Sequence, residues 1–358
     1  MIVCSKCGLE DIVDYVKNMD EVYLEFLARF DSGQTPDKKE MNLQLKENGI
    51  VRDTKEIEMM IGNASPDAIT REILFSKNDY VSYYKTIKEP EPKLGLPVDE
   101  MGLSEGIAKY LQEKKITNFY KFQEEAILEI ISGNNVIITA PTASGKTEAF
   151  TIPVIHKVAK QGKSGIVSAV FVYPTKALSR DQLPKIKEIA SKVGISVAVF
   201  DGDTKQKERL EIIDKPPSII VTNFDVLHYH MMYKTKFASL LSTIEFLVVD
   251  ETHVYSGIFG SNVHYIIKRL KRLCKKIQFV AASATLDNAL DFCQQLFGEK
   301  MHLVTGSGKK GETDFVMIFP SLRTQRALTI DLLDKLVKKK HKTMVFSDRK
   351  STRLNSSH

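Results

Sequence analysis

The residues best suited to chemistry lie in a loop of small side chains that ends in Gly-Lys-Thr at positions 145–147. A β-branched run over residues 136–139 precedes the loop, and a helical pattern follows it. This strand–loop–helix order lets the N–H groups at a helix start face an anion. We therefore predict a phosphate-binding loop in which Lys146 reaches the β- and γ-phosphates of a nucleotide and Thr147 holds Mg²⁺. The predicted nucleotide-lining residues are Pro141, Thr142, Ala143, Ser144, Gly145, Lys146 and Thr147.

Two adjacent carboxylates, Asp250 and Glu251, follow a second apolar run at residues 246–249. A buried acidic pair is costly unless a cation or a proton compensates it. We predict that Asp250 holds Mg²⁺ and that Glu251 orients and activates the attacking water. His253 completes the predicted catalytic set with these two carboxylates and Lys146. An acidic cap at a strand end is the plain structural alternative, and the phosphate-binding loop upstream disfavours it.

The elements that must position these residues are strands alternating with helices. Several of the apolar runs are continuous rather than alternating in polarity, as expected for parallel strands covered on both faces. The alternation predicts an α/β fold with a doubly wound parallel sheet, in which ligands gather at the carboxyl ends of the strands. The predicted strands cover residues 135–140, 166–173, 195–200, 218–222, 245–250 and 277–283, and two of the predicted helices cover 105–114 and 124–132.

Polar residues at other strand ends are candidates for contact with nucleic acid. A helix start that bears Thr175, Lys176 and Arg180 could clamp a phosphate, although an ordinary strand-to-helix turn would look the same. Turns at residues 201–204 and 222–225 are generic when taken alone. Hydroxyls at residues 283 and 285 could reach His253 or the carboxylates.

Residues 1–98 read as a mainly helical extension that ends in a linker rich in proline at 88–97. Within it, Ser65 and Pro66 predict the start of a helix. Cys4 and Cys7 form a C-x-x-C-G turn that is open to three interpretations: half of a zinc site, a redox pair, or two free thiols. The four cysteines make no disulfide framework, so a reducing cytoplasm is expected.

The C-terminal part predicts the start of a second α/β lobe at residues 313–347, with a buried strand at 343–347. Residues 348–358 can be back-translated into a string that resembles a sequencing adapter, so we expect them to be an artefact. Without them the formal net charge falls from +6 to +4, because Asp348, Arg349, Lys350 and Arg353 together carry +2. No apolar run reaches the length of a membrane span, which is about 18 residues.

Taken together, residues 99–312 and the start of the next lobe resemble a superfamily-two DExH helicase. Gln123, with Tyr120 before it, lies where these proteins carry a glutamine that reads adenine. Alanine at position 140, where the general loop pattern has glycine, is also frequent among them. The matching segments are 140–147 with motif I, 174–178 with motif Ia, 222–223 with motif Ib, 250–253 with motif II, 283–285 with motif III, and 345–347 with the opening of motif IV. The resemblance implies that the doubly wound parallel sheet is RecA-like. It also implies nucleic-acid contact at Pro174, Thr175, Lys176, Arg180, Gly202, Thr222 and Asn223, and a coupling role for Ser283, Ala284 and Thr285.

A subgroup resemblance rests on residues 250–263, on Lys268-Arg269-Leu270, and on the turns at 201–204 and 222–228. These segments are similar to the YprA-like, Lhr-related and RecQ-like DNA helicases. That similarity implies ATP-dependent movement from 3′ to 5′ on single-stranded or forked DNA, with a role in repair. Motifs V and VI do not occur in the 358 residues, so we expect this chain to bind ATP weakly and to hydrolyse little. An RNA helicase or remodelling translocase, and a non-catalytic nucleotide- or nucleic-acid-binding module, are the alternatives.

Overall fold

The computed structural model describes residues 53–76, 79–87, 91–141, 143–284, 288–308, 312–320 and 324–346. It divides into two compact units. The larger unit spans Pro90–Lys310, and the smaller combines Met1–Glu89 with Gly311–His358. Cys4, Cys7, Thr142, Thr285 and the expected adapter segment lie outside the described residues.

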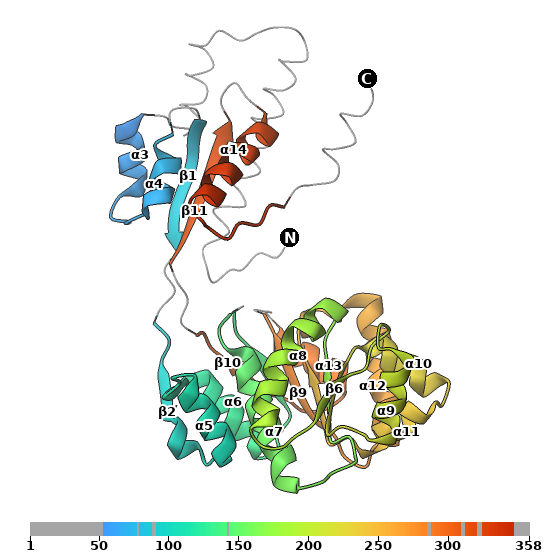
Figure 1. The fold of residues 1–358 in the computed structure, drawn as a ribbon. Helices are drawn as coiled ribbons and strands as arrows, with labels where there is room; N and C mark the ends of the chain where they lie inside the picture. Colours follow the sequence, from blue (N-terminus) through green and yellow to red (C-terminus); the bar gives the residue numbers. More distant parts are fainter. Residues whose placement is uncertain are drawn as a thin grey trace, which may run out of the picture. The chain divides into compact units, whose positions relative to one another are not determined.

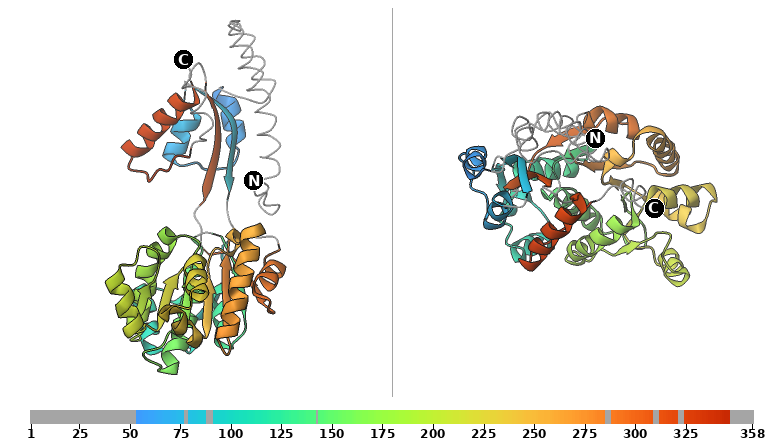
Figure 2. Two further views of the ribbon diagram at one scale, coloured as in Figure 1. Left: turned by 90° about the vertical axis from the view of Figure 1, so that its right-hand side faces the viewer. Right: turned by 90° about the horizontal axis from the view of Figure 1, so that it is seen from above.

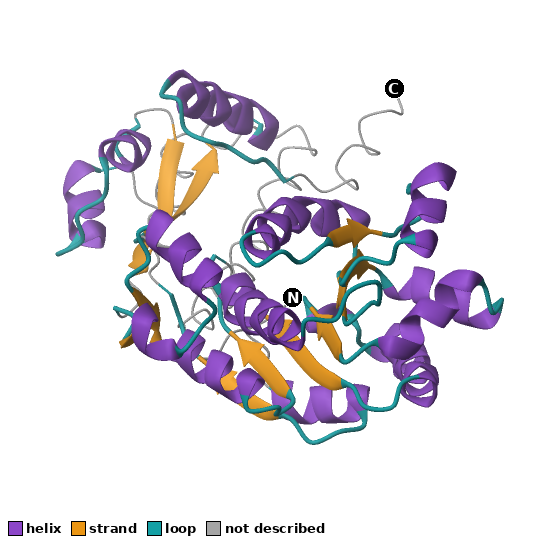
Figure 3. Ribbon diagram, turned by 60° about the horizontal axis from the view of Figure 1, so that its bottom comes forward, coloured by secondary structure: helices purple, strands orange, loops and turns teal. Residues whose placement is uncertain are grey.

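The larger unit is built on a seven-stranded sheet in which every neighbouring pair is parallel (Figures 1 and 3). The strand order is β10-β4-β9-β8-β5-β7-β6, so the chain begins near one edge and crosses back to finish beside β4. This is the doubly wound arrangement that the sequence predicts. The strands are β4 (Val136–Thr139), β5 (Ala169–Val172), β6 (Val197–Val199), β7 (Ile219–Thr222), β8 (Phe246–Val249), β9 (Gln278–Ser283) and β10 (His302–Thr305).

Successive strand residues point to opposite sides of this sheet, so both of its faces are apolar, and helices cover both. In β4, Val136 and Ile138 belong to one buried cluster, whereas Ile137 belongs to the other. The first cluster takes residues from α5–α8, and the second from α9–α13. The helices are α5 (Glu105–Glu113), α6 (Lys121–Ile131), α7 (Lys146–Gln161), α8 (Lys176–Ser191), α9 (Gln206–Asp214), α10 (Phe224–Met232), α11 (Lys236–Leu240), α12 (Gly257–Leu273) and α13 (Ala289–Phe297), with short 3-10 turns η1 (Val98–Met101), η2 (Leu241–Thr243) and η3 (Thr252–Val254).

The six predicted strands are confirmed as β4–β9, with ends that differ by up to three residues. The edge strand β10 was not predicted. The prediction of a linker up to residue 97 is wrong for its last residues, because Leu94–Pro97 forms β2 and pairs with β3 (Asn118–Tyr120). Proline is tolerated there, since this ribbon has only two strands and Pro97 closes it.

The smaller unit contains an antiparallel pair, β1 (Asp79–Ile87) with β11 (Thr313–Pro320), which Figure 2 shows side by side. The expected helical character holds for α3 (Thr54–Ile61) and α4 (Ala68–Leu74), but residues 79–87 form a strand instead. Their tyrosines and valine favour a pleated, half-buried surface. The unit also contains α14 (Gln325–Lys338).

Two local predictions in the smaller unit are wrong. Helix α4 is capped by Asp67, whose carboxylate accepts from Thr70 N at 2.7 Å, rather than by Ser65. Residues 343–346 form no strand, and the Phe346 side chain is 87% exposed. No neighbouring strand among the described residues pairs with this segment, so nothing there buries its apolar side chains.

Among the described residues, no helix has the length and apolar character to cross a bilayer.

The start of α12 gives a test of the packing. A Cβ added to Gly260 would lie 2.1 Å from the Tyr255 carbonyl oxygen, which is backbone and cannot rotate away. We expect Gly260→Ala to lower the free energy of unfolding by about 1–3 kcal/mol, as overpacking does. Ser261→Ala, at the exposed neighbouring position, should change it by less than about 0.5 kcal/mol. Urea unfolding measures both. A stabilised Gly260→Ala variant, which helix propensity alone favours, would contradict this packing.

Candidate nucleotide-binding site

The loop between β4 and α7 has the backbone of an anion cradle. Ala143 and Gly145 both adopt the left-handed conformation, with φ of 62° and 90°. Glycine is favoured at the second position by its φ of 90°, and a Cβ there would also lie 2.4 Å from Nε2 of Gln123, so that side chain would have to move. Such left-handed turns point successive N–H groups into one concavity. The loop therefore has the form that the predicted phosphate-binding role needs.

Two polar groups in this loop are buried. Lys146 is 8% exposed, and its Nζ donates to the carbonyl of Ala140 at 2.6 Å. Ser144 is 2% exposed, and its hydroxyl has no hydrogen-bond partner among the described residues. A buried hydroxyl without a partner costs free energy unless a ligand supplies one. The loop thus suits an anionic ligand that accepts hydrogen bonds.

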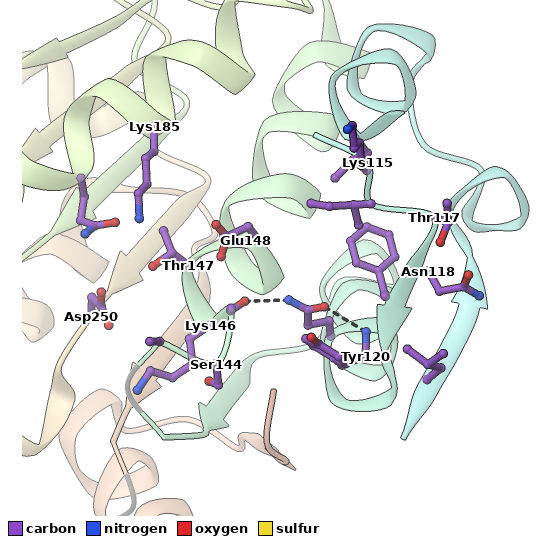
Figure 4. A pocket seen from close by; sticks show the side chains of 18 of the residues that line it. Lys115, Thr117, Asn118, Tyr120, Ser144, Lys146, Thr147, Glu148, Lys185 and Asp250 are labelled. Atoms are coloured by element: carbon purple, nitrogen blue, oxygen red, sulfur yellow. Dashed lines mark hydrogen bonds between the residues drawn. The ribbon is translucent and has the colours of Figure 1, made fainter. Parts of the chain in front are cut away.

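Gln123 ties the loop to the segment before α6. Its Oε1 accepts from Tyr120 N at 3.0 Å, and its Nε2 donates to the carbonyl of Gly145 at 3.0 Å (Figure 4). The side chain is buried, with 7% exposure. The structure therefore brings the two residues predicted to read adenine against the phosphate-binding loop.

The acidic pair lies at the end of β8. Asp250 is 7% exposed, and its carboxylate accepts from Glu251 N at 2.8 Å. Burial, followed by the neighbouring charge of Glu251, raises the pKa of Asp250 to about 6. Glu251 itself has a left-handed backbone with φ of 51°. Such strain in a non-glycine residue is typical of functional sites.

His253 links the acidic pair to the end of β9. Its Nδ1 lies 3.3 Å from Oε2 of Glu251 and 3.3 Å from the hydroxyl of Ser283. The expected contact between a hydroxyl of the 283–285 segment and His253 is confirmed for Ser283. Ala284 follows the strand end, and Thr285 lies outside the described residues.

The phosphate-binding loop, Gln123 and the acidic pair converge on one pocket of about 770 Å³ at the carboxyl edge of the sheet. Figure 4 shows Thr147, Lys185 and Asp250 on one side of it and Thr117, Asn118 and Tyr120 on the other. A buried carboxylate with a raised pKa beside a second one suits a divalent cation, so the residues present fit Mg²⁺. Lining residues include Lys115, Thr117, Asn118, Tyr120, Gln123, Ala143, Ser144, Gly145, Lys146, Thr147, Glu148, Gln182, Lys185, Asp250 and Glu251.

Several of these lining residues were not among the predicted site residues: Lys115, Thr117, Asn118, Gln182 and Lys185. Thr117 and Asn118 could have been found, because they come just before the predicted adenine-reading residues in the sequence. Lys185 gave none, because it reads as an exposed lysine on a helix.

The predicted nucleic-acid residues lie along the same carboxyl edge. Thr175 caps α8 by accepting from Leu178 N at 3.2 Å, and Asn223 caps α10 by accepting from Val226 N at 3.0 Å. Thr222 donates to the carbonyl of Phe200 at 2.6 Å. Pro174 lies in the turn between β5 and α8. Thr175 and Asn223 thus shape the strand-to-helix turns at the carboxyl ends of β5 and β7.

The two cations of this set are paired with carboxylates of the turn that follows β6. Arg180 contacts the buried Asp201 with two nitrogens, each at 3.1 Å, and Lys176 Nζ lies 2.7 Å from Asp203. Gly202 is within this turn, where an added Cβ would lie 3.0 Å from Nζ of Lys176. The sequence did not reveal these pairs, because they join residues more than 20 positions apart.

No group of three or more histidine, cysteine or acidic residues that could hold a metal ion occurs in the part of the chain that the structure describes. The half zinc site proposed for Cys4 and Cys7 stays a prediction. The other two cysteines, Cys274 and Cys293, are free and buried, which agrees with the packing role that their helical patterns indicate.

The loop, the acidic pair and the parallel sheet define a RecA-like nucleotide-binding domain. Residues 120–292 match the DEAD/DEAH box helicase family, so the chain contains a DEAD/DEAH box helicase domain.

Named relatives extend this assignment. The chain is 33% identical over 275 residues to the ATP-dependent helicase YprA of Bacillus subtilis, covering 72% of this chain and 36% of YprA. It is 36% identical over 192 residues to the ATP-dependent helicase HRQ1 of Saccharomyces cerevisiae, covering 51% and 18%. The chain thus spans about a third or less of these relatives.

Among solved structures, the helicase MrfA bound to DNA and AMPPNP superposes with a TM-score of 0.70 at 31% identity. The match covers 80% of this chain and 41% of that protein. The DEAD-box helicase Mss116 bound to single-stranded RNA matches with a TM-score of 0.56 at 18% identity, which shows a shared fold.

The raised pKa of Asp250 predicts a pH-dependent stability. A carboxyl whose folded pKa is raised stabilises the fold fully below its unfolded pKa of about 3.9, and this stabilisation is lost as the pH rises through about 6. Asp250→Asn removes the buried charge and keeps an acceptor for Glu251 N. At pH 8, without nucleotide or Mg²⁺, we expect this variant to be more stable by up to about 3 kcal/mol, from 1.36 kcal/mol per pKa unit.

The gain should shrink to near zero at pH 4, where the native carboxyl is protonated. Thermal unfolding at both pH values measures it. If the Asp250→Asn variant is no more stable than the native chain at pH 8, other groups in the native fold already compensate the buried carboxylate.

Proposed function

We propose that this chain is the ATP-binding part of an ATP-dependent DNA helicase that moves from 3′ to 5′ on single-stranded or forked DNA. The observation that carries the proposal is the convergence of Lys146, Asp250 and Glu251 in one pocket with a phosphate-binding loop. The relatives named as ATP-dependent helicases support the activity. The direction of movement and a role in DNA repair rest on the resemblance to YprA-like helicases.

The pocket suggests how its residues act on ATP. Lys146 exchanges its contact with the Ala140 carbonyl for the β- and γ-phosphates, and the loop N–H groups and Ser144 hold the phosphate oxygens. Thr147 and Asp250 would hold Mg²⁺, which neutralises charge on those oxygens.

The attacking water needs a base. Glu251 accepts its proton, and His253 at 3.3 Å orients that carboxylate. Since His253 also contacts Ser283, a change at Glu251 can pass to the turn after β9. This is a direct physical route for the coupling role proposed for residues 283–285.

Contact with nucleic acid is proposed for the turns at the carboxyl edge. MrfA, a structural relative at 31% identity, is bound to DNA in the matching structure, which supports DNA over RNA. Contacts to backbone phosphates predict binding that is independent of sequence and weakens steeply with salt. An ATPase stimulated more by RNA than by DNA would favour the RNA helicase alternative.

We also propose that the chain is a fragment whose second lobe, with its arginine fingers, completes the catalytic site. The match to 36% of YprA and 41% of MrfA supports this. Transition-state charge on the γ-phosphate needs those arginines, so the fragment alone should turn over ATP slowly. Reading the source gene through codon 347 by a second sequencing method tests the proposal. A frame that encodes residues 348–358 and then stops would contradict it.

A cytoplasmic location accompanies this function. The two free buried thiols, Cys274 and Cys293, are consistent with a reducing compartment.

Nucleotide binding can be tested in this chain directly. We expect Lys146→Ala to weaken ATP binding at least tenfold, or about 1.4 kcal/mol, because it removes the buried cation of the loop. Lys187→Ala, an exposed position on α8 outside the pocket, is the matched control. Anisotropy of a fluorescent ATP analogue measures both variants. Equal affinities for the two would contradict the assigned phosphate site.

Hydrolysis needs the second lobe, so it is tested in the full-length protein. Glu251→Gln should leave ATP affinity within about threefold and lower the hydrolysis rate by at least about 100-fold, since a general base is lost while the shape is kept. Rapid-quench measurement of phosphate release reads the rate. Turnover close to that of the native protein would remove Glu251 from the mechanism.

A further inference from the structure

A dense run of cations at the end of α12 has no part in the function proposed above. Because α12 returns from the end of β8, its last turn lies at the amino edge of the sheet, opposite the ATP pocket. The position of Gln278 confirms this, since β9 begins there two residues after Lys276. The cations are Lys268, Arg269, Lys271, Arg272, Lys275 and Lys276.

Two hollows of about 600 Å³ and 280 Å³ open beside this run. They share Gly133, Lys275, Lys276 and Gln278, so they adjoin one another. Five lysines and two glutamates line the pair, which gives a net charge of +3. The lysines are Lys157, Lys163, Lys271, Lys275 and Lys276, and the glutamates are Glu245 and Glu299.

Three of the five lysines are already engaged. Lys157 donates to the carbonyls of Ile130 and Ile131 at 3.1 and 3.0 Å. Lys163 pairs with Glu245, and Lys271 pairs with Glu299. Both carboxylates that line the hollows therefore have lysine partners.

The remaining two, Lys275 and Lys276, are exposed and have no ion pair or side-chain hydrogen bond among the described residues. Attraction to a helix dipole explains Lys271 and Arg272, which stand in the last turn of α12. It does not explain the two free lysines, because α12 ends at Leu273 and the adjacent carbonyls of α6 are bonded to Lys157 and Gln278. The free pair instead adds uncompensated positive charge to both hollows.

We infer that Lys275 and Lys276 form a second contact for nucleic-acid backbone phosphates, on the edge of the sheet opposite the ATP pocket. Lysine acts on phosphate as a point charge and reads no base, so this contact is independent of sequence. The inference rests on the proposed nucleic-acid binding and adds to it a second place where the strand is held. It predicts that a bound strand extends past the strand-end turns and around the domain.

The reach between the two contacts sets the probe length. Helix α12 has 17 residues, which at 1.5 Å per residue span about 25 Å. Stacked nucleotides rise about 3.4 Å each, so a stacked strand of about 8 nucleotides matches this straight distance, and the path over the surface between the two edges is longer. A strand of about 8 nucleotides should occupy the strand-end turns alone, whereas one of about 40 should reach both contacts.

The test compares Lys275→Ala/Lys276→Ala with Lys187→Ala/Lys215→Ala, a control that removes the same charge from exposed positions away from these hollows. Fluorescein-labelled single strands of about 8 and about 40 nucleotides are titrated into the full chain, and anisotropy is followed across a salt series. For the long strand, we expect the test variant to bind several-fold more weakly and its slope of log K against log salt to fall by about 1.4, which is 0.7 for each lost phosphate contact.

The short strand should bind the native chain and both double variants equally. Equal slopes for the native chain and the test variant on the long strand would overturn the second contact and leave the proposed function standing. A slope lowered as much by the control would show a general charge effect and would also overturn it. A native chain that binds neither strand would contradict the proposed nucleic-acid binding itself, and with it this inference.

Discussion

Burying the Asp250 carboxylate beside Glu251 costs free energy, and the rest of the site is arranged around that cost. The end of β8 carries this charge into a place where water is largely excluded, and the pKa of Asp250 rises to about 6 as a result. Lys146 and the N–H of Glu251 offset part of that cost. We propose that a bound nucleotide with its cation offsets the rest. The neighbouring loop likewise buries a polar group that has no partner among the described residues, the Ser144 hydroxyl.

The parallel sheet is what brings these groups together. Its strands all end at one edge, so segments that lie more than 100 residues apart in the sequence meet around one pocket. Three of the five non-glycine residues with positive φ in the described chain line that pocket, namely Lys115, Ala143 and Glu251. The rigid buried strands hold this strained backbone in place, which is how a fold stores free energy at a functional site.

The sequence predicts the centre of this domain well, because buried parallel strands leave continuous apolar runs such as residues 246–249. It misses β10, whose His302, Leu303 and Thr305 are exposed at the edge and give no such run. The chemistry of Lys146 and Asp250 is readable because it depends on local order. The pairing of Arg180 with Asp201 is not, since two carboxylates and two cations could combine in several ways until the fold selects one.

We propose that ATP binds at the carboxyl edge with its phosphates on the loop and its base near Gln123. Hydrogen–deuterium exchange of the chain, with and without ATP and Mg²⁺, tests this most directly. We expect slower exchange of amides at residues 143–149 and 120–124, with little change at the amino edge near residues 275–278. Unchanged exchange in the loop, or protection confined to another face of the sheet, would contradict it.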